Sequence, residues 1–106
     1  MIQDLLLIKI TKNCFSTYSS RLLFTLISQR DFCTRNELIN WTGFSNITIS
    51  RYLQEFGKSG LIGNAPGIVF VSDLGKEIFN ELGNLFEKEI EIATKIEREN
   101  QFFSRY

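Results

Sequence analysis

The 106-residue chain contains no histidine, two cysteines and one proline. A structural zinc site takes four ligands that are mostly cysteine and histidine, so this chain alone does not supply a set. We therefore expect no metal and no cofactor. Cys14 and Cys33 are interpreted first as free thiols in a reducing cytosol; a disulfide and a redox-sensing thiol remain the alternatives.

Sequence features of an enzyme are also missing. There is no histidine for acid–base chemistry, no nucleophile elbow, no phosphate-binding loop and no carboxylate pair apart from glutamates expected in solvent. The sequence therefore predicts a protein that is not an enzyme.

No run of eighteen apolar residues exists, so the sequence predicts no membrane span. The apolar opening segment is interrupted by Asp4 and Lys9 and lacks both a basic leader and a small-residue cleavage site. We interpret it as part of the fold and expect a cytoplasmic protein, in the host cell if it is encoded by a virus or plasmid.

The net charge is zero, which argues against a protein that coats nucleic acid by charge alone. The charge is unevenly distributed, however. Residues 1–71 carry seven basic and four acidic side chains, whereas residues 72–106 carry five basic and eight acidic ones. With 43% hydrophobic residues and ten phenylalanines, the chain is expected to fold into one globular unit whose two parts have different roles.

Three helices are predicted before residue 43. Residues 2–12 fit both a helix and a strand, and we favour a helix that packs on the rest of the chain or on a second subunit. Residues 17–29 form an amphipathic helix capped by Thr17 or Ser19. Residues 34–42 form a short helix with a Thr34/Glu37 capping box, and Gly43 ends it.

A fourth helix over residues 45–57 begins at Ser45 and buries one stripe, Ile49, Leu53 and Phe56; Gly57 or Gly60 ends it. The pattern then changes to two short strands, 61–62 and 68–71. Pro66 and Gly67 suit the central positions of a type II turn between them. These residues predict a β-hairpin.

From residue 74 the pattern is helical to the end of the chain. A helix of about thirty residues is about 45 Å long, so it would project from a domain of this size and need a partner helix. The sequence thus predicts a domain at 1–73 and a dimerisation helix at 74–106. Its acidic residues, Glu87, Glu89, Glu91, Glu97 and Glu99, are expected in solvent. The predicted dimer contacts are Phe79, Leu82, Phe86, Ile90, Ala93, Ile96 and Phe103. The first three of these are assigned partly to the domain core as well.

Residues 34–62, TRNELINWTGFSNITISRYLQEFGKSGLI, resemble the core of a winged helix-turn-helix module. The chain is similar to multidrug-resistance-regulator-type repressors and to small archaeal winged-helix proteins with a coiled-coil C-terminal helix. This resemblance implies a mainly α fold with a small β-hairpin (α+β) and a long C-terminal dimerisation helix. It also implies that the helix at 45–57 enters the major groove of double-stranded DNA.

Asparagine, glutamine and arginine side chains can recognise base edges, and helix N-termini can hold phosphates. Arg51 is the strongest candidate, with an ion pair to Glu55 as its alternative role. Ile47 either contacts a thymine methyl or packs on the preceding helix. Thr34, Arg35 and Asn36 either hold a phosphate or merely cap their helix. The full predicted DNA-binding set is Thr34, Arg35, Asn36, Ser45, Asn46, Ile47, Thr48, Ser50, Arg51, Gln54, Lys58 and Asn64.

Two features depart from the family pattern. The hairpin at 61–71 has no lysine or arginine, and the helix at 45–57 has a single cation. We therefore expect a homodimeric, sequence-specific transcriptional regulator whose affinity depends on two copies. A protein-interaction module and a non-specific DNA-architectural protein remain the alternatives. No residue pattern demands a small-molecule effector.

Overall fold

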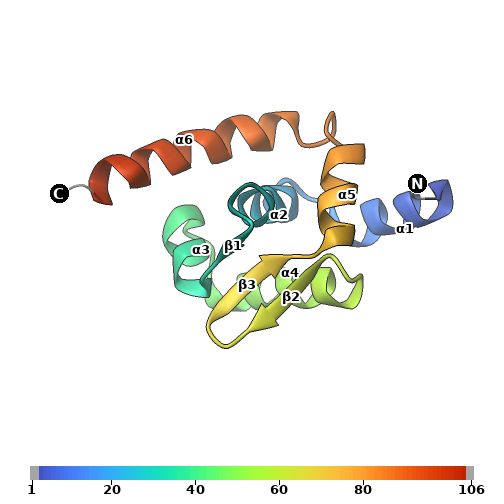
Figure 1. The fold of residues 1–106 in the computed structure, drawn as a ribbon, viewed down its shortest axis with the longest axis horizontal. Helices are drawn as coiled ribbons and strands as arrows, with labels where there is room; N and C mark the ends of the chain where they lie inside the picture. Colours follow the sequence, from blue (N-terminus) through green and yellow to red (C-terminus); the bar gives the residue numbers. More distant parts are fainter. Residues whose placement is uncertain (1–2, 105–106) are drawn as a thin grey trace.

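A computed structural model describes residues 3–104, and the side chains of residues 3–99. Within this range the chain forms six helices and a three-stranded antiparallel sheet, an α+β arrangement compatible with a winged helix (Figure 1). The elements in order are α1 Asp4–Cys14, α2 Tyr18–Arg30, β1 Phe32–Cys33, α3 Arg35–Thr42, α4 Asn46–Lys58, β2 Ile62–Ala65, β3 Ile68–Val71, α5 Asp73–Glu81 and α6 Glu87–Ser104.

The predicted helix starts are confirmed by their capping hydrogen bonds. The Thr17 side chain accepts from the backbone N–H of Ser20, which resolves the choice of cap for α2. Thr34 and Glu37 form the complete capping box of α3, and Gly43 ends that helix with a left-handed φ of 72°. The opening segment is helical, as favoured. Local sequence signals therefore place these helices within a residue or two.

The predicted hairpin is confirmed, but the sheet has a third strand that the sequence did not predict. The strand order is β1-β3-β2, with Phe32 opposite Phe70 and Ile62 opposite Val71. Strand β1 has only two residues, which is too short for an alternating pattern to be visible. Strand β1 pairs with the edge of β3 opposite β2, and this pairing depends on tertiary contacts rather than on local sequence.

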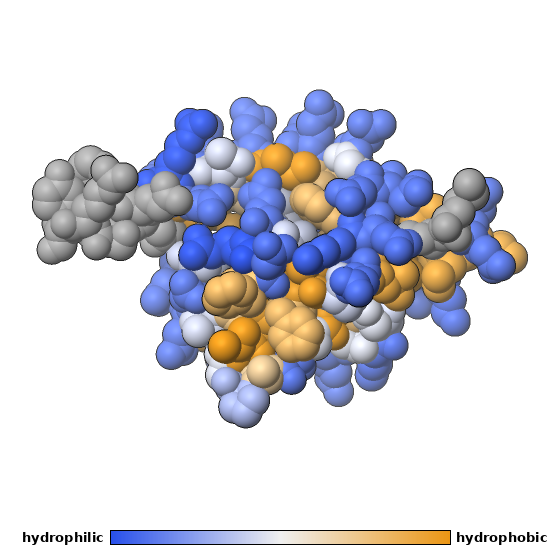
Figure 2. All heavy atoms as spheres, viewed as in Figure 1, coloured by the Kyte–Doolittle hydropathy of each residue, from blue (hydrophilic) through white to orange (hydrophobic). Residues whose placement is uncertain are grey.

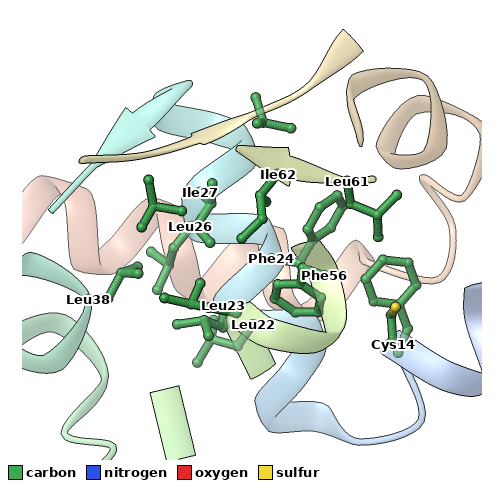
Figure 3. Packing of buried hydrophobic residues seen from close by; sticks show 14 of the residues in the cluster. Cys14, Leu22, Leu23, Phe24, Leu26, Ile27, Leu38, Phe56, Leu61 and Ile62 are labelled. Carbon is green, nitrogen blue, oxygen red and sulfur yellow. The ribbon is translucent and has the colours of Figure 1, made fainter. Parts of the chain in front are cut away.

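Phenylalanine rings form the centre of the core. Phe15, Phe24, Phe56 and Phe86 are each at most 1% exposed, and they come from four different parts of the chain. Phe24 of α2 lies beside Phe56 of α4, with ring centroids 5.4 Å apart (Figure 3). The Phe15 ring meets the Phe86 ring edge-on at 5.0 Å. This cluster joins α4 to the body of the protein.

The prediction of one long C-terminal helix is wrong. Helix α5 ends at Glu81, and α6 begins at Glu87 after a turn. Phe86 inserts into the core from this turn, and α6 then runs back over α2 (Figure 1). The apolar spacing continues through the turn, so periodicity alone does not reveal the reversal.

The reversal changes the role of the predicted dimer contacts. Phe86 and Ala93 are fully buried by the chain itself, and Phe79 packs against the rings of Phe24 and Phe86. Three more of these residues are partly buried against the same core: Leu82, Ile90 and Ile96. The Phe103 side chain lies outside the described residues. Dimerisation stays a prediction, because α2 covers much of the stripe that was assigned to a partner helix.

Glu89 was expected in solvent and is instead buried. Its carboxylate accepts a hydrogen bond of 2.9 Å from Nε of Arg21, and the two side chains are 3% and 22% exposed. The other side of the Arg21 guanidinium donates to the carbonyl of Phe15 at 2.9 Å. This ion pair links α6, α2 and the turn after α1.

Gly75, in the first turn of α5, has a packing role that helix propensity does not reveal. A Cβ at this position would lie 2.2 Å from the backbone oxygen of Leu61. Glycine therefore allows α5 to approach the start of the hairpin closely.

Over the described residues, the helices are too short or too polar to cross a membrane.

Candidate nucleic-acid interface

Helix α4 has one buried face and one exposed polar face. Ile49, Leu53 and Phe56 point into the core, as predicted. On the other side Ile47, Arg51, Gln54 and Lys58 follow at steps of four, three and four residues, and all four are exposed. This spacing places the four side chains along one stripe of the helix. We call these four residues the α4 stripe.

The first turn of α4 is fixed by two sets of hydrogen bonds. Ser45 caps the helix by accepting from the backbone N–H of Thr48 at 3.1 Å. Arg35, at the start of α3, donates through one nitrogen to Oδ1 of Asn46 at 3.0 Å and to the hydroxyl of Ser50. The structure thus brings together three predicted site residues, Arg35, Asn46 and Ser50. The spacing of 11 and 15 residues gave no sign of this contact.

Arg51 extends from the α4 stripe into solvent. Its guanidinium lies 5.8 Å from the ring centre of Tyr52, and within residues 3–99 it forms no ion pair. The alternative pairing with Glu55 is therefore not found. A cation over an aromatic ring retains its charge and its donors for an incoming acceptor.

Ile47 is 80% exposed, so the alternative that it packs on the preceding helix is wrong. A large aliphatic side chain with this exposure contributes nothing to the core of the chain itself. At the start of the α4 stripe it can contact a methyl group or another apolar surface of a partner.

The start of α3 is occupied by its capping box. The Thr34 hydroxyl accepts from the N–H of Glu37, and the Glu37 carboxylate accepts from the N–H of Thr34. This carboxylate would repel a phosphate at the helix end, so the arrangement favours the capping alternative for Thr34. Asn36 is exposed beside it.

The sheet presents an apolar outer face. Phe32 is 63% exposed, Ile68 38% and Phe70 39%, while Val69 and Val71 point inward. Figure 2 shows hydrophobic side chains gathered over the sheet. Asn64, the predicted contact of the hairpin, is exposed on β2 opposite Val69. The sequence predicted the strand at residues 68–71 but not which of its faces is exposed, and Phe32 was missed together with β1.

Both cysteines are free and buried. Burial, together with the nearby Glu37 carboxylate, raises the pKa of the Cys33 thiol to about 12. Burial also raises the pKa of Cys14, although its contact with the Ser59 hydroxyl opposes the change. These thiols lack the stabilised thiolate of a redox sensor. In the part of the chain that the structure describes, no three histidine, cysteine or acidic side chains are placed to hold a metal.

Comparison with known proteins gives no independent assignment, since no family model matches the chain and no curated protein matches it.

Proposed function

We propose that the chain is a winged-helix protein that binds double-stranded DNA sequence-specifically, as a transcriptional regulator, with α4 in the major groove. The observation that carries this proposal is the α4 stripe: Ile47, Arg51 and Gln54 are exposed on a helix whose opposite face is fixed in the core. Arginine and glutamine are suited to guanine and adenine edges, and an aliphatic side chain suits the thymine methyl. Arg35 supports this face by bonding Asn46 and Ser50.

The element order supports the winged-helix part of the proposal. Helices α2, α3 and α4 precede the β2–β3 hairpin, and β1 lies between α2 and α3 beside β3. In this arrangement the hairpin would lie against the duplex next to α4. Its lack of lysine and arginine leaves most phosphate contacts to α3, α4 and their surroundings.

The proposal includes a homodimer, because few cations per chain give a single copy low affinity. Helix α2 covers part of the predicted dimer contacts on α6, so another surface must contribute to the dimer interface. Helix α1 offers Leu5, which is 80% exposed, and Ile8, which is 64% exposed and lies one turn further on. Two such helices would bury these side chains against each other.

Duplex binding is expected to depend on salt. If two to three cations per chain contact phosphates, raising the salt from about 50 to 200 mM should weaken binding by about 10- to 40-fold for a single chain and by about 150- to 1,800-fold for a dimer. Fluorescence anisotropy with a labelled duplex of mixed sequence measures this change. The absence of binding at low salt by the folded protein would contradict the proposal.

A protein-interaction module is the second candidate, and one observation favours it. The apolar outer face formed by Phe32, Ile68 and Phe70 has the chemistry of a protein contact. If the folded chain fails to bind any duplex and instead loses partner binding on Phe32→Ser substitution, this candidate replaces the first.

A further inference from the structure

A cavity of about 240 Å³ lies between α1 and the C-terminal end of α4, away from the start of the α4 stripe. One wall of the cavity is formed by four residues of α1 that lie on the same face of that helix. The other wall is formed by the C-terminal end of α4. The lining residues are Leu6, Lys9, Ile10, Asn13, Lys58 and Ser59. The volume equals that of about eight waters, so the cavity suits a ligand smaller than a typical drug.

The charged side chains that line this cavity are both positive. Lys9 and Lys58 both line it, and no carboxylate does. Within the described part of the chain, neither lysine forms an ion pair. The Glu55 carboxylate also lies near the cavity, since it raises the pKa of Cys14, whose Sγ contacts Ser59. It forms no ion pair with Lys9 or Lys58 within the described residues, so both ammonium groups can contact an anion.

The walls of the cavity differ in polarity. Leu6 and Ile10 form an aliphatic wall on α1, whereas Asn13 and Ser59 add hydrogen-bonding groups beside the lysines. Ile10 is 3% exposed and Leu6 is 40% exposed, so a ligand can cover Leu6 further. A bare inorganic ion would leave this apolar wall unused.

We propose that this cavity binds a small organic anion: a carboxylate held between Lys9 and Lys58, with a compact apolar group against Leu6 and Ile10. The site does not depend on the proposed DNA binding. It gives Lys58 a role other than the DNA contact that the sequence predicted.

The test is an NMR titration of the full chain with hexanoate in the absence of DNA. Amide shifts are expected at residues 6–13 and 58–59, with saturation. Hexanamide has the same shape without the charge and is expected to bind at least about tenfold more weakly, since hydrogen bonds to charged groups are the stronger ones. Equal binding of the acid and the amide would overturn the proposal.

Charge-removing variants locate the site. Lys9→Gln and Lys58→Gln are each expected to weaken hexanoate binding by about tenfold, whereas Lys88→Gln, an exposed lysine of α6, is expected to leave it unchanged. Unchanged affinity in both cavity variants would overturn the assignment. If inorganic phosphate binds as tightly as hexanoate, the proposal that the ligand also carries an apolar group is overturned, and the cavity is a simple oxyanion site. Because no DNA is present, failure of the proposed function would leave these results unaffected.

Discussion

Replacing Arg51 by alanine is expected to raise the Kd for a selected duplex by about 5- to 150-fold for each half-site that it contacts. A bidentate arginine–guanine contact contributes about 1–3 kcal/mol of discrimination, which corresponds to this range. Arg51 is exposed and forms no ion pair within the described residues, so its removal should leave the fold intact. Anisotropy titrations of both proteins against the same duplex measure the effect.

The matched control is Arg98→Ala, which removes the same charge from an exposed position on α6. This variant should bind within about twofold of the wild type, because α6 lies on the other side of α2 from α4 (Figure 1). If Arg51→Ala and Arg98→Ala weaken binding equally, long-range charge rather than the α4 stripe governs the interaction.

Replacing Glu89 by alanine is expected to lower the free energy of unfolding by about 3 kcal/mol. Removing one member of a buried ion pair leaves the other charge without compensation, and such changes typically cost about 3–5 kcal/mol. Arg21 is 22% exposed, so water relieves part of the penalty and the lower end of that range applies. Urea denaturation followed by circular dichroism gives the value.

Glu91→Ala is the control for this change, because Glu91 lies two residues after Glu89 on the same helix and is exposed. It should alter the free energy of unfolding by less than about 0.5 kcal/mol. The double variant Arg21→Met with Glu89→Leu should recover most of the lost stability, because neither charge then remains buried. Equal stability of Glu89→Ala and the wild type would show that α6 does not pack on α2 as described.

The elements that the sequence predicted well are those defined by local chemistry. Thr34 and Glu37 are three residues apart, so their capping box is visible without any tertiary information. The stripe of Ile49, Leu53 and Phe56 likewise depends only on helical spacing. The same spacing left Arg51 and Gln54 on the opposite face, and the structure confirms that both are exposed.

The failures all involve contacts between distant residues. Strand β1 exists because Phe32 and Cys33 reach β3, about forty residues further along the chain. The turn before α6 exists because Phe86 fits between Phe15 and Phe24. Burial of Glu89 depends on Arg21, which is 68 residues away. A continuous apolar stripe with glutamates beside it is equally compatible with a projecting helix and with one that folds back.

Part of the site was predictable and part was not. The identity of the α4 stripe followed from the helix pattern, whereas the role of Arg35 did not. Its bonds to Asn46 and Ser50 depend on the angle between α3 and α4. The apolar sheet face depends on the placement of β1, so it was also beyond the sequence.

Selection of bound sequences from a random duplex pool tests the central claim most directly. The account predicts a consensus with two-fold symmetry, whose half-sites are centred about one helical turn, or 34 Å, apart. Such a result would establish sequence recognition and pairing of two chains together. The absence of any enriched sequence, from a protein shown to be folded, would contradict the account.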